Sequence, residues 1–169
     1  MDALEAIFTR RSIRKYAKGT VPGPVVTELL KAAMAAPSAG NKQPWHFVVI
    51  DDRQILERVI TFHPSAEMLH ETALGILICG DESLEKGKGY FPLDCSAAAQ
   101  NVLLAAHAKG LGAVWLGIYP RQDRIAGMRE LVGVPEGIVP FALISIGLPA
   151  EKAGPVERFD AGRVHRNRW

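Results

Sequence analysis

The stretch Arg10-Arg11-Ser12-Ile13-Arg14-Lys15-Tyr16 follows a short N-terminal segment in which Leu4, Ile7 and Phe8 recur at helical spacing. It places four cations and a hydroxyl within seven residues, although the whole chain of 169 residues has a net charge of only +2. Four like charges repel one another, and an anion bound among them would relieve that repulsion. A phosphate fits this cluster best, because the guanidinium fork of arginine matches phosphate oxygens in pairs.

The composition indicates one globular domain over residues 1–169, with 48% hydrophobic and 22% charged residues. So small a net charge does not predict a nucleic-acid partner. Cys79 and Cys95 lie in apolar contexts without a partnered spacing, which indicates buried thiols in a reducing compartment. No apolar run approaches the roughly 20 residues of a membrane helix, and the acidic N-terminus lacks a signal-peptide core. We therefore expect a cytoplasmic protein without a membrane partner.

Hydrophobic periodicity predicts the order of helices and strands. The expected helices cover residues 25–36, 54–60, 65–70, 94–109 and 123–131, and the expected strands cover 46–50, 73–79, 113–118 and 141–146. Asp94 is expected to cap the helix that it begins, and the charged segment 81–89 to form a loop or lid. Alternation of strands and helices would by itself predict a parallel sheet.

Motifs for several common sites are absent from the sequence. It contains no G-x-G-x-x-G after a strand, no Walker-type phosphate loop, no H-E-x-x-H and no G-x-S-x-G. His63 and His70, with Glu67 and Glu71 nearby, have a spacing that a metal could use. A solvated helix face explains these four residues more simply, so we expect no metal site.

Three features remain: the arginine cluster of residues 10–15, the loop Pro37-Ser38-Ala39-Gly40-Asn41-Lys42-Gln43-Pro44-Trp45, and Trp115-Leu116-Gly117. With Gln100-Asn101, Gly110-Leu111-Gly112 and a closing His165-x-Asn-x-Trp169 in this order, the chain resembles the FMN-dependent nitroreductases from end to end. The resemblance implies an α+β, three-layer α/β/α fold whose central sheet is mostly antiparallel, which replaces the parallel prediction. It also implies an intertwined homodimer whose C-terminal segment reaches onto the partner.

The resemblance assigns three groups of residues to FMN. The group at the ribityl phosphate and the polar flavin edge consists of Arg10, Arg11, Ser12, Arg14, Arg166 and Arg168. The group reaching the flavin from the partner subunit consists of Pro37, Ser38, Asn41 and Gln43. Leu116 and Gly117 would lie over the ring, with a backbone N–H close to the reactive N5. Arginines suit a phosphate, amides suit the pyrimidine ring, and glycine permits close backbone approach.

Simpler structural interpretations of these residues stay open at this point. Arg10 and Arg14 could form a solvated helix end, and the C-terminal cations a flexible end. Asn41 could be a turn residue in the left-handed conformation. Gly117 could mark a bulge at the end of a strand.

The implied activity is hydride transfer from NADH or NADPH through flavin N5 to an oxidised acceptor, such as a nitroaromatic or quinone, in a ping-pong cycle. Arg11 or Arg14 could stabilise the anionic reduced flavin, and no side chain need act as a catalytic acid or base. A non-enzymatic FMN-storage or redox-sensing protein is the alternative. A nucleic-acid binder using clusters 10–15 and 163–168 would lack the interleaved aromatic residues usual for such proteins. The acceptor, the preferred nicotinamide, and flavin fragmentation or reductive dehalogenation on the same scaffold stay open.

Overall fold

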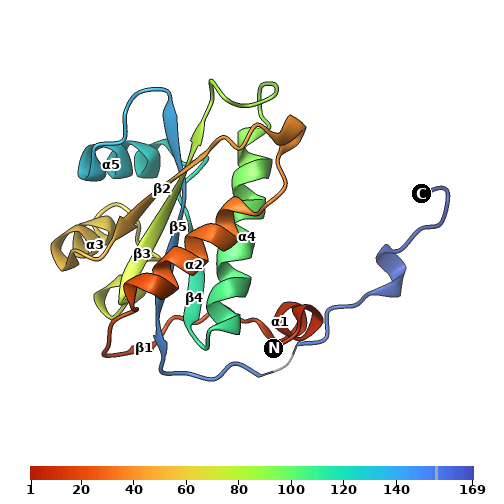
Figure 1. The fold of residues 1–169 in the computed structure, drawn as a ribbon, viewed down its shortest axis with the longest axis horizontal. Helices are drawn as coiled ribbons and strands as arrows, with labels where there is room; N and C mark the ends of the chain where they lie inside the picture. Colours follow the sequence, from red (N-terminus) through yellow and green to blue (C-terminus); the bar gives the residue numbers. More distant parts are fainter. Residues whose placement is uncertain (155) are drawn as a thin grey trace.

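The computed structural model describes residues 1–154 and 156–169, and it has three layers (Figure 1). The middle layer is a five-stranded sheet with α2 and α4 on one face and α3 and α5 on the other. Its strands are β1 (Tyr16–Ala17), β2 (Trp45–Ile50), β3 (Leu74–Asp81), β4 (Gly112–Gly117) and β5 (Ile138–Pro149). The α-helices are α1 (Ala3–Thr9), α2 (Gly23–Met34), α3 (Arg53–Ile60), α4 (Phe91–Ala108) and α5 (Gln122–Val132). Short 3₁₀ turns are η1 (Ala39–Asn41), η2 (Glu67–His70) and η3 (Ala161–Arg163).

All pairings between the named strands are antiparallel. The order is β1-β5-β3-β2, and β4 also pairs with β5. The antiparallel sheet implied by the family resemblance is therefore confirmed, and the parallel sheet predicted from alternation alone is wrong. Alternation fails because a helix can also join antiparallel strands, and a hydrophobic pattern does not reveal strand direction.

Each face of the sheet has its own hydrophobic core. On the face covered by α2 and α4, Leu29 and Val102 pack with Ile76 of the sheet. On the face covered by α3 and α5, Leu56 and Met128 pack with the sheet side chains that point to that face. The first seven residues of β3 are buried, as expected for a strand covered on both faces. Covering both faces leaves only the edges and ends of the sheet for ligands.

The expected elements are present with small shifts at their ends, and β1, only two residues long, was not predicted. The prediction that Asp94 caps α4 is wrong, because the helix begins at Phe91 and places Asp94 inside its first turn. The carboxylate of Glu85 accepts hydrogen bonds from the N–H groups of Gly89 (3.1 Å) and Phe91 (3.0 Å) at this helix start. Part of the charged segment 81–89 therefore serves to cap α4.

The C-terminal segment leaves the sheet after β5 and passes α1, and the chain ends far from the body of the protein (Figure 1). Its large apolar side chains are exposed, including Phe159 and Trp169. No helix among the described residues is long and apolar enough to cross a bilayer.

Candidate functional site

The arginine cluster lies against the beginning of β4. Ser12 forms a parallel bridge with Ala113, and the N–H of Ile13 donates to the carbonyl of Ala113 at 3.0 Å. Ile13 is buried, whereas Ser12 and Arg14 are exposed. The chain approaches closely here because of Gly112, where an added Cβ would lie 2.7 Å from the Ile13 side chain. Ile13 thus anchors the cluster and leaves its hydroxyl and cations facing solvent.

Residues 150–154 run back along the cluster. The carboxylate of Glu151 accepts from the N–H groups of Arg14 (2.6 Å) and Lys15 (3.2 Å), which lowers the pKa of that carboxyl. The Arg11 side chain donates to the carbonyls of Gly154 (3.0 Å), Phe8 (2.9 Å) and Arg10 (2.7 Å). Since three carbonyls of its own chain use its guanidinium, Arg11 mainly ties α1 to the C-terminal segment.

Arg10 lies in an electropositive environment. Burial lowers the pKa of its guanidinium, and the nearby cations Arg158 and Arg11 lower it further. The neighbouring His107, hydrogen-bonded to Thr9 at 2.8 Å, has a pKa lowered by burial and by Arg10. An anion bound here would offset this repulsion, which meets the requirement for a phosphate. Arg158 is a member of the cluster that the sequence did not reveal, because it lies some 140 residues further along the chain.

Among the cavities that flank the cluster, two lie beside its exposed cations. One of about 890 Å³ lies between α1 and the C-terminal segment, and one of about 440 Å³ is lined by Ser12 and Arg14 with Glu67, Met68 and Glu151. Both open to solvent beside the cations, so a ligand phosphate has room to approach them.

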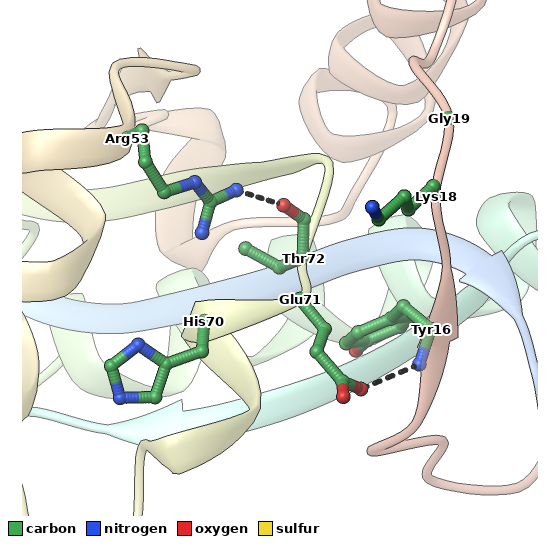
Figure 2. Close-up of a pocket in the computed structure, with 7 residues that line it drawn as sticks. All are labelled: Tyr16, Lys18, Gly19, Arg53, His70, Glu71 and Thr72. Carbon is green, nitrogen blue, oxygen red and sulfur yellow. Dashed lines mark hydrogen bonds between the residues drawn. The ribbon is translucent and has the colours of Figure 1, made fainter.

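The chain that follows the cluster is anchored at β1 (Figure 2). The Tyr16 N–H donates to the Glu71 carboxylate at 3.4 Å, and Arg53 donates to the carbonyls of Leu69 and Thr72. Burial raises the pKa of Tyr16 to about 12, so its hydroxyl stays protonated and donates to the Ile13 carbonyl at 2.8 Å. A cavity of about 430 Å³ among these residues is separate from the two beside the cluster. Its charged side chains, Arg53 and Glu71, already form hydrogen bonds with backbone groups.

The loop Pro37–Gln43 presents two amide side chains to solvent. Two of its N–H groups are satisfied within the loop, since Gln43 donates to Ser38 Oγ and Asn41 to the Ser38 carbonyl, both at 2.9 Å. The Gln43 side chain donates to Asn41 Oδ1 at 3.2 Å. Asn41 (φ 55°) and Gln43 (φ 50°) are left-handed, as the simpler interpretation of Asn41 anticipated. Two non-glycine residues in this conformation store strain, which is often found at functional sites.

Gly117 ends β4 at the edge of the sheet. The Ala113 carbonyl points away from β5, since it accepts from Ile13, and groups of alternate residues in a strand point the same way. The N–H and C=O of Gly117 therefore also point outward from β5. Pairing with β5 runs without a register shift to Gly117, so the bulge interpretation is wrong. An added Cβ would meet no atom within 4 Å, and this open space would admit a flat ligand against the backbone.

Two polar side chains that the sequence did not single out together meet the Gly117 carbonyl. Arg124 of α5 donates to it at 2.7 Å through Nη1, and His63 Nε2 lies 3.1 Å from it. His63 is only 2% exposed, and burial, followed by the charge of Arg124, lowers its pKa. The interpretation of His63 as part of a solvated helix face is wrong, because it is buried between α3 and η2. No group of three metal-ligating side chains occurs among the described residues.

The structure thus separates the predicted residues into three groups. The arginine cluster, Leu116 and Gly117 lie along β4, although the Leu116 side chain is buried in the core. The loop 37–43 precedes β2 at the other edge of the sheet, three strand spacings or about 14 Å away. The C-terminal segment carries Arg166 and Arg168 beyond α1, and no side-chain hydrogen bond or ion pair joins them to another described residue.

Comparison with known proteins identifies the family. The model of the Nitroreductase family matches residues 7–72 and 63–148. A relative from Methanothermobacter thermautotrophicus, whose name, NADH dehydrogenase/NAD(P)H nitroreductase, is itself provisional, is 48% identical over 169 residues, covering 100% of this chain and 88% of the relative.

Solved structures agree with this assignment. A protein from Parabacteroides distasonis with the same provisional name has a TM-score of 0.94 at 40% identity, covering 98% of each chain. A protein from Desulfovibrio desulfuricans, provisionally named a nitroreductase and solved in complex with FMN, has a TM-score of 0.84 at 30% identity, covering 98% of this chain and 96% of that one. The chain therefore belongs to the nitroreductase family.

Proposed function

We propose that this protein is an FMN-dependent oxidoreductase that passes hydride from NADH or NADPH to an oxidised small-molecule acceptor, such as a nitroaromatic or quinone, in a ping-pong cycle. One observation carries the proposal: the arginine cluster and the Gly117 backbone lie along the same strand edge. Ala113, beside the cluster, is four residues from Gly117, or about 13 Å in an extended strand. FMN requires such a separation, because its ribityl chain holds the phosphate away from the ring.

The phosphate end of the site consists of Arg10, Ser12 and Arg14. Arg10 and Arg14 form charge-assisted hydrogen bonds with the phosphate, which offsets the repulsion around Arg10. Arg11 lies beside them and fixes the start of the cluster through its three carbonyl contacts. Arg158 adds positive charge from the C-terminal segment.

The site is completed by a second subunit. The loop that bears Pro37, Ser38, Asn41 and Gln43 lies at the opposite sheet edge from Gly117 in one chain, so in our proposal these residues reach the flavin from the partner. The exposed apolar side chains Leu4, Ile7 and Phe8 of α1, with Phe159 of the C-terminal segment, supply surface for such a homodimer. The same segment brings Arg166 and Arg168 to a phosphate in the dimer.

When bound, FMN supplies the hydride chemistry at N5. The chain's own residues bind the phosphate, hold the ring against the Gly117 backbone, and place an N–H at the reacting end of the ring. No side chain is assigned the role of a catalytic acid or base.

Absorbance spectroscopy of the purified protein tests the proposal. The protein reconstituted with FMN should be yellow and dimeric, and excess NADH or NADPH should bleach the flavin band under anaerobic conditions. A nitroaromatic or quinone added afterwards should restore the band. The absence of a flavin band after reconstitution would overturn the proposal. A yellow protein that neither nicotinamide bleaches would instead support FMN storage or redox sensing.

A further inference from the structure

The Gly117 carbonyl is held by two side chains that the proposed binding of FMN does not use, the buried His63 and the half-buried Arg124. Arg124 Nη1 lies 2.7 Å from the carbonyl oxygen, and the same nitrogen lies 3.0 Å from His63 Nε2. His63 comes from the turn after α3, and Arg124 from the first turn of α5. Two elements far apart in sequence therefore converge on one backbone carbonyl at the end of β4.

The convergence is costly for the fold. His63 Nδ1 and Arg124 Nε are buried without a hydrogen-bond partner. A buried polar group without a partner destabilises a protein, because it loses its hydrogen bonds to water and gains none in return. Gly117 pairs in register with Ala142, but its carbonyl points away from β5, so its described partners are these two side chains rather than the sheet. Unpaired buried polar atoms in a native structure often have a functional reason.

Arg124 keeps its hydrogen bond to the Gly117 carbonyl in either tautomer of His63. An arginine N–H only donates, so His63 Nε2 accepts from Arg124 in one tautomer and donates to Gly117 in the other. Burial and the adjacent guanidinium both favour neutral His63, which therefore packs beside Arg124 without repelling it.

We propose that Arg124 and His63 are positioning residues that fix the Gly117 backbone where it meets the flavin, and that the Arg124 charge stabilises the reduced flavin. This proposal rests on the FMN site proposed above. Gly117 has no side chain to restrain it, so the tethered carbonyl holds the direction of the neighbouring N–H. Because both groups of Gly117 face the same side, a ring atom that accepts from the N–H lies near the guanidinium. Negative charge on the reduced ring would be favoured there.

Three variants test the proposal. Arg124→Gln removes the charge, Arg124→Lys keeps the charge without the fork, and Arg121→Gln is the matched control. Arg121 is the N-cap residue of α5, and its exposed guanidinium pairs only with Asp123 among the described residues. The measurements are the midpoint potential of bound FMN, the rate of flavin reduction by NADH, and amide hydrogen exchange of residues 115–119 in the apoprotein.

We expect Arg124→Gln to make the midpoint potential more negative and to slow reduction roughly tenfold, as small displacements at a reacting centre do. Exchange of residues 115–119 should become faster even without FMN. Arg124→Lys should recover the potential while exchange stays fast, and Arg121→Gln should match the wild type in all three measurements. A wild-type potential and reduction rate in FMN-bound Arg124→Gln would overturn the proposal.

The design separates this inference from the proposed function. If the wild type binds no FMN, the proposed function fails, and exchange in the apoprotein still reports whether the pair restrains Gly117. If Arg124→Gln does not fold, Arg124→Lys carries the test, and unchanged exchange in that variant would overturn the positioning role.

Discussion

The carboxylate of Asp94, buried in the first turn of α4, accepts a hydrogen bond from the backbone N–H of Ala39 at 2.9 Å. The contact joins a core helix to the loop that carries Ser38, Asn41 and Gln43. Asp94 thus fixes the loop proposed to contact the partner's flavin, although the residue itself is too deeply buried to touch a ligand.

Asp94→Ala should loosen this loop and weaken FMN binding together. It leaves the Ala39 N–H without an acceptor, a loss of about 1–3 kcal/mol in the free energy of unfolding. Chemical denaturation measures the first effect and fluorescence titration with FMN the second. Asp94→Asn retains an acceptor oxygen and should lose less of both. Equal losses in the two variants would contradict a role for this hydrogen bond.

Arg10→Ala should weaken FMN binding by about 1.5–3 kcal/mol, the range for a hydrogen bond to a charged group. That corresponds to a roughly 10- to 150-fold higher Kd. The control is Arg58→Ala, which removes an exposed arginine of α3 and should leave the Kd unchanged. An unaltered Kd in Arg10→Ala would show that Arg10 is only a surface charge.

Gly117→Ala should separate stability from cofactor binding. The space beside Gly117 is open in the chain itself, so alanine should leave the apoprotein as stable or stabilise it by about 0.5 kcal/mol. The added methyl group would occupy the side from which the flavin approaches, so FMN affinity should fall. Gly23→Ala, at a second open glycine, should not change affinity. Loss of apoprotein stability in Gly117→Ala would contradict this account.

Stability of the apoprotein should decline as the pH falls below about 6.5, the ordinary pKa of histidine. The pKa of His63 is lowered in the folded state, so below that pH the unfolded chain binds more protons and is favoured. Denaturation midpoints from pH 7.5 to 5 should show this decline, and His63→Gln should flatten it. His107 contributes in the same direction, so His107→Gln provides the comparison. A slope unaffected by His63→Gln would place the titrating group elsewhere.

Phe8→Glu should convert the proposed homodimer into a monomer. Phe8 is 67% exposed on α1, beside the C-terminal segment, and a carboxylate at this position would be costly to bury in an interface. Light scattering coupled to size-exclusion chromatography measures the mass. The monomer should also lose FMN, because the loop of the partner would no longer reach it. A dimeric Phe8→Glu protein would place the interface on another surface.

Much of the fold could be predicted from the sequence because strands such as 73–79 and helices such as 25–36 have clear apolar periodicity. Strand direction could not, since the residues that pair β3 with β5 lie more than 50 positions apart. Family resemblance supplied the antiparallel sheet. The start of α4 was missed because Glu85, which caps it, lies several residues before the helix inside a charged loop.

The individual site residues could be predicted only as segments. The arginine cluster and the amide loop are dense in polar groups, and both are local in sequence. Arg158 and the pair of His63 and Arg124 come from distant elements, and each is an isolated polar residue in its own segment. Only the folded chain brings them to Arg10 and to Gly117. Their placement therefore requires the structure, and their roles toward FMN stay predictions.

The amide loop and Gly117 lie on opposite edges of the sheet. If two subunits share each FMN site as proposed, this arrangement has a genetic consequence. In a mixed dimer, one subunit carrying Arg10→Ala and the other Gln43→Ala, both lesions fall in the same FMN site and the second site is intact. Two defective alleles expressed together should therefore complement each other and restore part of the flavin binding that neither homodimer retains. Occupancy should likewise fall on dilution, since the subunits that form the site would separate.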